Sequence, residues 1–170
     1  MLSKQIIYVT GLPCSGATLV GQLLGHHPEI DSPVSSSPLC QALIGLRQHL
    51  SQDDCLSAQL DADFERTYAR LMRSFRGFVD AWFAATEQSW VVDKHQDWLQ
   101  HLEIVHQLDP NCRLLVCVRE LGQIYASLEA QHQATTAIQP PTHQPLPKRF
   151  EVMLRQSFGW FYETFYPGQL

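Results

Sequence analysis

Residues 11–19 read Gly-Leu-Pro-Cys-Ser-Gly-Ala-Thr-Leu, and this stretch decides the fold. A β-branched and aromatic segment, residues 5–10, precedes it and predicts a buried strand. Apolar side chains at helical spacing follow and predict a helix from about Thr18 to His26. A glycine turn between strand and helix exposes backbone N–H groups at the positive end of the helix dipole, where a phosphate or sulfate binds. The stretch therefore predicts an anion site, and a glycine turn without a ligand is the alternative.

The same nine residues nearly match the nucleotide-binding P-loop, G-x-x-x-x-G-K-[ST]. Gly11, Gly16 and Thr18 fit this pattern. Ala17 stands where a lysine neutralises the β- and γ-phosphates of ATP or GTP. The alanine argues against a P-loop kinase or NTPase and leaves the anion cradle intact.

Length and composition predict one globular domain, residues 1–170, which is 45% hydrophobic and 17% charged. The net charge of −5 argues against a nucleic-acid partner, because affinity for the phosphate backbone needs clustered Lys and Arg. No apolar run approaches the roughly 18 residues that a membrane span needs. The five cysteines form no C-x-x-C pair, so we expect reduced thiols, no metal site and a cytoplasmic protein.

Helices and strands alternate along the chain, which predicts an α/β fold with a three-layer parallel β-sheet flanked by helices. A second strand is expected over residues 90–92. Residues 113–118 form the clearest strand, a continuous apolar run suited to burial on both faces of a parallel sheet. The other expected elements are a loop over 31–38, a helix over 39–50, a polar break over 51–57, a helix around 98–105, a turn over 109–111 and a helix opening at Leu121.

Two amphipathic helices are expected from apolar residues at three- and four-residue spacing. The first runs over residues 60–82, and we expect its aromatic stripe to face the core. The second covers residues 150–165, where an exposed face would favour a homo-oligomer. The Pro-rich residues 134–147 between them predict a loop, either a plain connector or a lid.

Three chemically distinctive residues fall at expected strand ends: Gly11, Lys94 and Arg119. Ligands of parallel sheets bind at the carboxyl ends of the strands, so we expect these residues at one site. Ser127 follows Arg119 by two helical turns, and both could reach one phosphate if the helix packs across the strand end. Lys94 as a solvated charge and Ser127 as a small packing residue are the alternatives.

In these motifs the chain resembles the sulfotransferase family that uses 3′-phosphoadenylyl sulfate. Residues 11–19 resemble the family's 5′-phosphosulfate loop, and residues 116–127 resemble its 3′-phosphate motif. Residues 93–98 are similar to the central segment that carries a catalytic Lys or His in several branches. The resemblance covers about residues 5–130, and its specificity comes from the three motifs standing in this order at this spacing.

The resemblance implies a P-loop nucleotide-hydrolase-like topology and a set of site residues. Those implied to bind the cofactor are Cys14, Ser15, Gly16, Ala17, Thr18, Leu19, Arg119 and Ser127. Lys94 would bridge the sulfuryl and leaving oxygens, and His95 would accept the proton of the acceptor. Arg119 and Ser127 would hold the 3′-phosphate. The implied reaction takes 3′-phosphoadenylyl sulfate to adenosine 3′,5′-bisphosphate without a metal, on a small-molecule or glycan acceptor.

The chain departs from the family pattern at two points. Cys14 stands where members usually carry Arg or Lys, and losing that cation removes a charge-assisted bond of about 1.5–3 kcal/mol. Members also usually continue further, so we expect a domain that is short at its C-terminus, with an acceptor site that is incomplete or shared with a partner. These departures keep a catalytically impaired nucleotide-binding protein as the alternative to an active sulfotransferase, with a P-loop kinase or NTPase less favoured.

Overall fold

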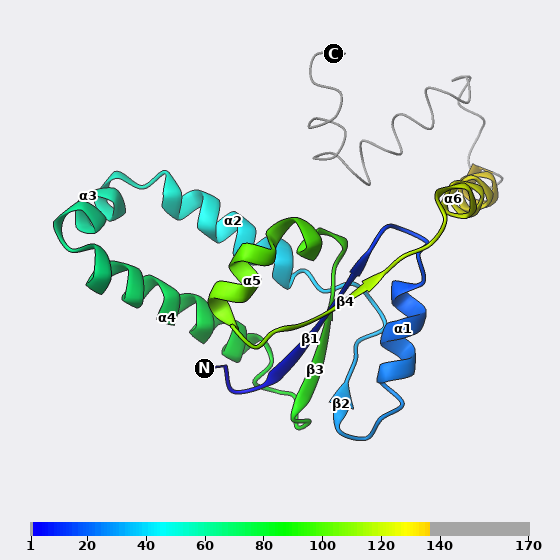
Figure 1. Cartoon of the computed structure of the whole chain (residues 1–170), viewed down its shortest axis with the longest axis horizontal. Coiled ribbons are helices and arrows are strands. Elements are labelled where there is room, and N and C mark those ends of the chain that lie inside the picture. The colour runs from blue at the N-terminus through cyan, green and yellow to red at the C-terminus, as the bar shows by residue number, and fades with distance from the viewer. Residues whose placement is uncertain (1, 137–170) are drawn as a thin grey trace, which may run out of the picture. The chain divides into compact units, whose positions relative to one another are not determined.

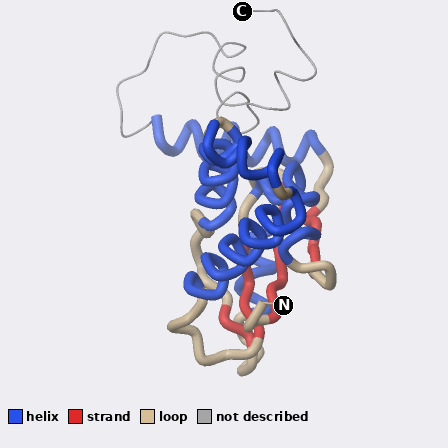
Figure 2. Tube along the Cα trace, turned by 90° about the vertical axis from the view of Figure 1, so that its left-hand side faces the viewer, coloured by secondary structure: helices blue, strands red, loops and turns tan. Residues whose placement is uncertain are grey.

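The computed structural model describes residues 2–136, and its centre is a four-stranded sheet in which every pair is parallel. The strand order is β2-β3-β1-β4 (Figure 1). The strands lie side by side in a single layer (Figure 2). Their bounds are β1 Gln5–Gly11, β2 Ile30–Asp31, β3 Trp90–Lys94 and β4 Arg113–Cys117. The helices are α1 Ala17–Leu24, α2 Leu39–Ser51, α3 Asp54–Ala62, α4 Phe64–Trp82, the 3₁₀ helix η1 Gln96–His101, α5 Leu102–Leu108 and α6 Leu121–Thr136.

Alternate residues of the central strands build two apolar layers, one on each face of the sheet. Ile6 and Tyr8 of β1 pack with Val91 of β3 in a core that includes residues of α2, α4 and α5. Ile7 and Val9 point to the other face, where they form a smaller core covered by α1. Figure 1 shows α1 on one side of the sheet and α2, α4 and α5 on the other. The predicted three-layer parallel α/β fold is therefore confirmed.

The chain divides into two compact units after Glu120. The first, Met1–Glu120, contains the sheet with α1 to α5. The second begins at Leu121 with α6, in which Ile124 and Leu128, one turn apart, are buried. The single domain expected over residues 1–170 stays a prediction.

Two local features differ from the sequence expectation. Ile30–Asp31 forms the short edge strand β2, whereas the loop was expected to begin at residue 31. The helix expected over residues 60–82 is two helices, because Asp63 adopts a non-helical backbone and accepts a hydrogen bond from the Arg66 N–H as the cap of α4. The first of these helices, α3, also begins inside the expected polar break, where the Asp53 carboxylate caps it.

The expected burial of the third strand is wrong within the described residues. β4 pairs with β1 alone at one edge of the sheet, and the side chains of Leu115 and Val116 are 40% and 43% exposed. The apolar run predicts burial on both faces but does not show how many strands flank it, and among the described residues β4 has β1 as its single neighbour.

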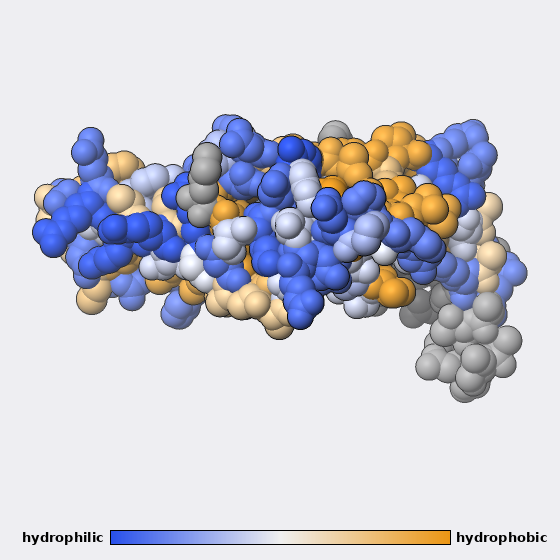
Figure 3. Space-filling model, turned by 90° about the horizontal axis from the view of Figure 1, so that it is seen from below, coloured by the Kyte–Doolittle hydropathy of each residue, from blue (hydrophilic) through white to orange (hydrophobic). Residues whose placement is uncertain are grey.

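The aromatic stripe of α4 is only partly in the core. Phe75 and Val79 are buried, whereas Phe64 is 61% exposed and Trp82 is 42% exposed. Figure 1 shows the reason: α3 and much of α4 extend beyond the sheet. In Figure 3 the left-hand part, which α3 and α4 occupy, is covered largely by hydrophilic side chains, and apolar side chains gather further to the right.

The remaining expectations fall mostly beyond the described part of the chain. Residues 134–136 continue α6, so the expected loop over 134–147 does not begin at its first residue, and the rest of it lies outside the described residues. The amphipathic helix expected over 150–165, with the homo-oligomer inferred from it, also lies outside them. Among residues 2–136, no helix combines the length and apolar character needed to cross a bilayer.

Candidate functional site

The loop between β1 and α1 depends on two glycines for its shape. Gly11 has a φ of 152°, and a Cβ added to it would lie 2.5 Å from the carbonyl oxygen of Cys117 and 2.6 Å from the Ser15 Oγ. A side chain at this position would therefore collide with the backbone of β4. Gly16, with a φ of 102°, precedes α1 and supplies no capping side chain. Cys14 between them also has a positive φ, 61°.

The backbone N–H groups at the start of α1 are open to a ligand. The Ser15 N–H donates to the Leu12 carbonyl at 3.0 Å and closes a turn, so this amide is engaged within the loop. The Val20 N–H makes the first helical bond, to the Gly16 carbonyl. In the described structure, the four amides between them, residues 16–19, make no hydrogen bond. These donors lie at the positive end of the helix dipole, where the sequence predicts the anion cradle.

Lys94 extends from the carboxyl end of β3 to this cradle. Its ammonium donates to the Thr18 hydroxyl at 3.0 Å and to the Val34 carbonyl at 3.1 Å, and the residue is only 6% exposed. Burial lowers the pKa of Lys94, because the charged form loses hydration. Both acceptors are neutral, and no carboxylate of the described chain pairs with this ammonium. A partly desolvated cation beside unpaired N–H groups is chemistry that suits an oxyanion.

The segment that provides the Val34 carbonyl is fixed to β3. The Ser37 N–H donates to the Lys94 carbonyl at 3.0 Å, and the Ser37 hydroxyl accepts from the Leu39 N–H at the start of α2. The expected loop over 31–38 therefore borders the site, as its place in the sequence indicates. The sequence carries no signal for the role of Val34, because its carbonyl and not its side chain makes the contact.

Asp93, next to Lys94, is a buried carboxyl that sequence reasoning did not single out. Its Oδ1 accepts from the Trp98 indole N–H at 2.6 Å. Its Oδ2 is sealed from solvent, and no group of the described chain meets the geometry of a hydrogen bond to it. Burial raises the pKa of Asp93, although the neighbouring Ser37 and Trp98 side chains lower it. Asp93 ties the end of β3 to η1 and so supports the position of Lys94.

His95 is placed beside Lys94, but its ring is engaged locally. The Asp97 N–H donates to the His95 Nδ1 at 3.2 Å, which makes His95 the cap of η1. The Asp97 carboxylate lies 3.7 Å from the same nitrogen, too far for a hydrogen bond. A ring nitrogen that accepts a hydrogen bond is unprotonated, so the neutral ring carries its proton on Nε2.

Arg119 follows β4 and reaches the loop. Its Nη1 donates to the Cys14 carbonyl at 2.8 Å, across 105 positions of the chain. Gly11, Lys94 and Arg119 thus lie together at the carboxyl ends of the strands, as the strand-end pattern predicts. Ser127 belongs to the second unit, where its hydroxyl donates to the Gln123 carbonyl, and its place beside a phosphate stays a prediction.

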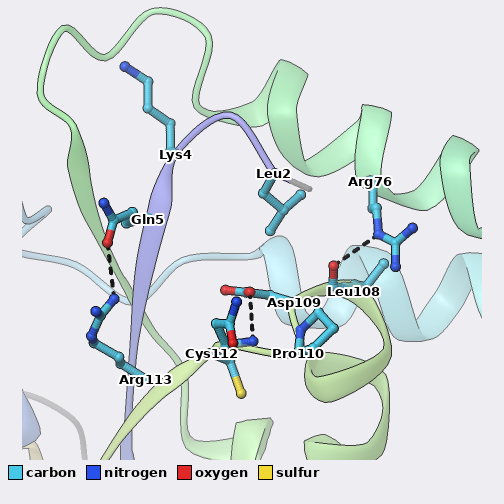
Figure 4. A pocket seen from close by; sticks show the side chains of 10 residues that line it. Leu2, Lys4, Gln5, Arg76, Leu108, Asp109, Pro110, Cys112 and Arg113 are labelled. Carbon is cyan, nitrogen blue, oxygen red and sulfur yellow. Dashed lines mark hydrogen bonds between the residues drawn. The ribbon is translucent and has the colours of Figure 1, made fainter.

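A separate hollow lies at the opposite end of the strands, with a volume of about 780 Å³ (Figure 4). Its three cationic side chains already serve neutral oxygens: Arg76 binds the Leu108 and Gln107 carbonyls, Arg113 binds the Gln5 side chain, and Lys4 binds the Thr86 and Gln88 carbonyls. In Figure 4 Lys4 points away from Asp109 in the middle of the hollow, so the cations do not converge on one point. We therefore interpret these hydrogen bonds as structural contacts that hold neighbouring elements together, and not as a ligand site.

A parallel α/β sheet flanked by helices, with a glycine-containing loop between its first strand and first helix, defines a P-loop-like fold. A family model described as the sulfotransferase family matches residues 6–155, so the chain belongs to the sulfotransferase family. No curated protein matches the chain. The family makes this protein a transferase whose general chemistry is the movement of sulfuryl groups.

Proposed function

We propose that this protein transfers a sulfuryl group from 3′-phosphoadenylyl sulfate to a hydroxyl or amine. The observation that carries the proposal is the buried Lys94 ammonium beside the N–H groups of residues 16–19. Within residues 2–136, the ammonium donates to neutral acceptors only, and these N–H groups make no hydrogen bond. Such an arrangement of positive charge and hydrogen-bond donors can stabilise an anionic group during its transfer, and family membership supports sulfuryl as that group.

The loop residues fit a phosphosulfate. Beyond the open N–H groups, the Ser15 Oγ is buried under the loop without a partner in the described chain. The Thr18 hydroxyl accepts from Lys94, so its own proton is free to donate to a ligand oxygen. When bound, 3′-phosphoadenylyl sulfate supplies the activated sulfuryl group. Lys94 would stabilise charge on the transferred group, and Arg119 with Ser127 would hold the 3′-phosphate.

His95 needs a more specific proposal than the sequence allowed. As a base it would have to accept a proton at Nε2, the nitrogen that carries the proton in the observed hydrogen-bonding state. We propose that His95 donates from Nε2 to an oxygen of the reacting groups while Nδ1 caps η1. Acting as the base would first require the ring to release the Asp97 N–H.

Other parts of the proposal rest on the sequence. The acceptor is a small molecule or glycan, the location is cytoplasmic, and no metal takes part. All five cysteines are free thiols, which suits a reducing compartment. Within residues 2–136, no group of three or more His, Cys, Asp or Glu could hold a metal ion.

The test is calorimetric titration with adenosine 3′,5′-bisphosphate, with ATP–Mg²⁺ as the comparison ligand. We expect micromolar binding of the bisphosphate that Lys94→Met weakens by at least about tenfold, or about 1.4 kcal/mol. Lys4→Met is the matched control, because Lys4 also donates to two neutral oxygens but lies at the other end of β1. No binding by folded wild-type protein, or equal losses in both variants, would contradict the proposal. Tighter ATP–Mg²⁺ binding with turnover would favour a kinase or NTPase.

Cys14 is the observation that favours the second candidate, a nucleotide-binding protein with impaired catalysis. It stands at the position where the resembled family pattern has a cation. Release of adenosine 3′,5′-bisphosphate from 3′-phosphoadenylyl sulfate, measured with a panel of hydroxyl and amine acceptors, separates the two candidates. If wild-type protein binds 3′-phosphoadenylyl sulfate without releasing adenosine 3′,5′-bisphosphate, and Cys14→Arg does release it, the protein is a nucleotide-binding protein with impaired catalysis.

A further inference from the structure

The loop over residues 11–16 carries no cation of its own. Arg119 reaches this loop from the end of β4, and Lys94 reaches the first turn of α1 from the end of β3, where it donates to the Thr18 hydroxyl. The contact of Arg119 is specific, because its Nη1 binds the carbonyl of Cys14 at 2.8 Å. Cys14 is the position at which the resembled pattern has an arginine or lysine.

The Cys14–Ser15 peptide is held on both sides. Its carbonyl accepts from Arg119, and its N–H donates to the Leu12 carbonyl at 3.0 Å. A peptide unit is planar, so two fixed ends determine its orientation. The orientation of this peptide determines the direction of the chain as it enters Gly16. The positive φ of Gly16 then determines how the N–H groups of the anion cradle point. Arg119 therefore acts on the geometry of the cradle as well as on its charge.

We propose that Arg119 serves the 5′-phosphosulfate loop, by fixing the Cys14 carbonyl and by supplying the positive charge that position 14 lacks. This proposal deepens the proposed function and rests on it, since it concerns the same nucleotide site. This role is additional to the one that the sequence motif implies, in which Arg119 contacts the 3′-phosphate. Here the guanidinium supports binding of the other end of the nucleotide, where the sulfuryl group is carried.

Two ligands that differ only at the 3′ position separate these roles. Adenosine 5′-monophosphate lacks the 3′-phosphate, and adenosine 3′,5′-bisphosphate has it. If Arg119 serves the loop, Arg119→Ala weakens binding of the monophosphate by about tenfold, the size of one lost charge-assisted hydrogen bond. If Arg119 serves only the 3′-phosphate, the variant binds the monophosphate as wild type does and loses affinity for the bisphosphate alone.

The matched control is Arg113→Ala. Arg113 lies at the other end of β4 and also donates to one neutral oxygen, that of Gln5, so the variant removes the same charge far from the loop. We expect less than a twofold effect from it on either ligand. Thermal unfolding of both variants identifies any general loss of structure, and in that event Arg119→Lys, which keeps the charge, is titrated in its place.

A second variant tests the charge directly. Adding Cys14→Arg to Arg119→Ala returns a cation to the loop, and we expect it to restore at least about threefold of the lost affinity for adenosine 5′-monophosphate. Unchanged monophosphate affinity in Arg119→Ala overturns the proposal while leaving the sulfotransferase site intact. Failure of wild-type protein to bind either nucleotide overturns the proposed function, and this inference with it.

Discussion

Replacing Asp93 with asparagine should change how the stability of the protein depends on pH. Asp93 is fully buried, with Oδ1 bound to the Trp98 indole and Oδ2 without a partner in the described chain. Burial raises its pKa above the ordinary value of 3.8, so between pH 3.8 and the pKa of the folded state the folded protein binds more protons than the unfolded chain. The stability from this group is therefore complete below pH 3.8 and is lost as the pH rises through the pKa of the folded state.

The size of the effect follows from the pKa shift. Each unit by which burial raises the pKa of Asp93 costs about 1.4 kcal/mol of stability at pH values above both pKa values. Asparagine resembles the protonated acid and still offers an oxygen to the Trp98 indole. We therefore expect Asp93→Asn to be more stable than wild type at pH 8, with a difference that shrinks toward zero or reverses near pH 4.

The assay is urea denaturation of both proteins at half-unit steps from pH 4 to pH 8. Subtracting the two unfolding free energies at each pH cancels the titration of groups that both proteins share. Asp61→Asn, which changes an exposed carboxylate on α3, should give a difference below about 0.5 kcal/mol at every pH. If the difference in unfolding free energy between Asp93→Asn and wild type does not vary with pH, the conclusion that burial disfavours the charged form of Asp93 is refuted.

Three further predictions concern the cradle and its neighbours. Because burial lowers the pKa of Lys94, wild-type protein should gain stability as the pH rises from that pKa toward 10.5, and Lys94→Met, unlike Lys4→Met, should lose this gain in urea denaturation. His95→Asn keeps an acceptor for the first turn of η1 and should match wild-type stability, whereas His95→Ala should lower the free energy of unfolding by about 0.5–2 kcal/mol. If His95→Asn is as stable as wild type but loses turnover, the imidazole ring itself is needed for the reaction. Gly16→Ala should lower the free energy of unfolding by about 1–2 kcal/mol, because Gly16 has a positive φ. Gly77→Ala, in the middle of α4 where an added methyl group meets no atom, should raise the free energy of unfolding by about 0.5–1 kcal/mol; thermal unfolding measures both changes.

The sheet was predictable because its signals are local. Apolar runs at residues 5–10, 90–92 and 113–118 mark the strands, and the glycine turn after the first marks the helix that follows. β2 escaped the prediction because two residues are too few to show a period. The break at Asp63 escaped because the apolar spacing continues across it, and only the cap shows that the helix restarts.

The candidate site was predictable to the level of strand ends and not to the level of contacts. The parallel arrangement of the strands brings Gly11, Lys94 and Arg119 to the same end of the sheet, independently of the contacts that their side chains make. The contacts of Arg119 with the Cys14 carbonyl and of Lys94 with the Val34 carbonyl involve backbone atoms, which leave no trace in residue identity. The state of His95 likewise depends on one backbone N–H that only the structure places.

The order of the strands has a consequence for how the chain acquires its structure. β1 pairs only with β3 and β4, so Gln5 meets Trp90, and Ile7 meets Arg113. During synthesis the first strand has no partner until most of the first unit has been made, and its apolar residues stay exposed in the meantime. Pairings this remote in sequence form slowly, because a long loop must close before any contact compensates for its entropy. The anion cradle, built on the end of that first strand, is therefore completed late in folding.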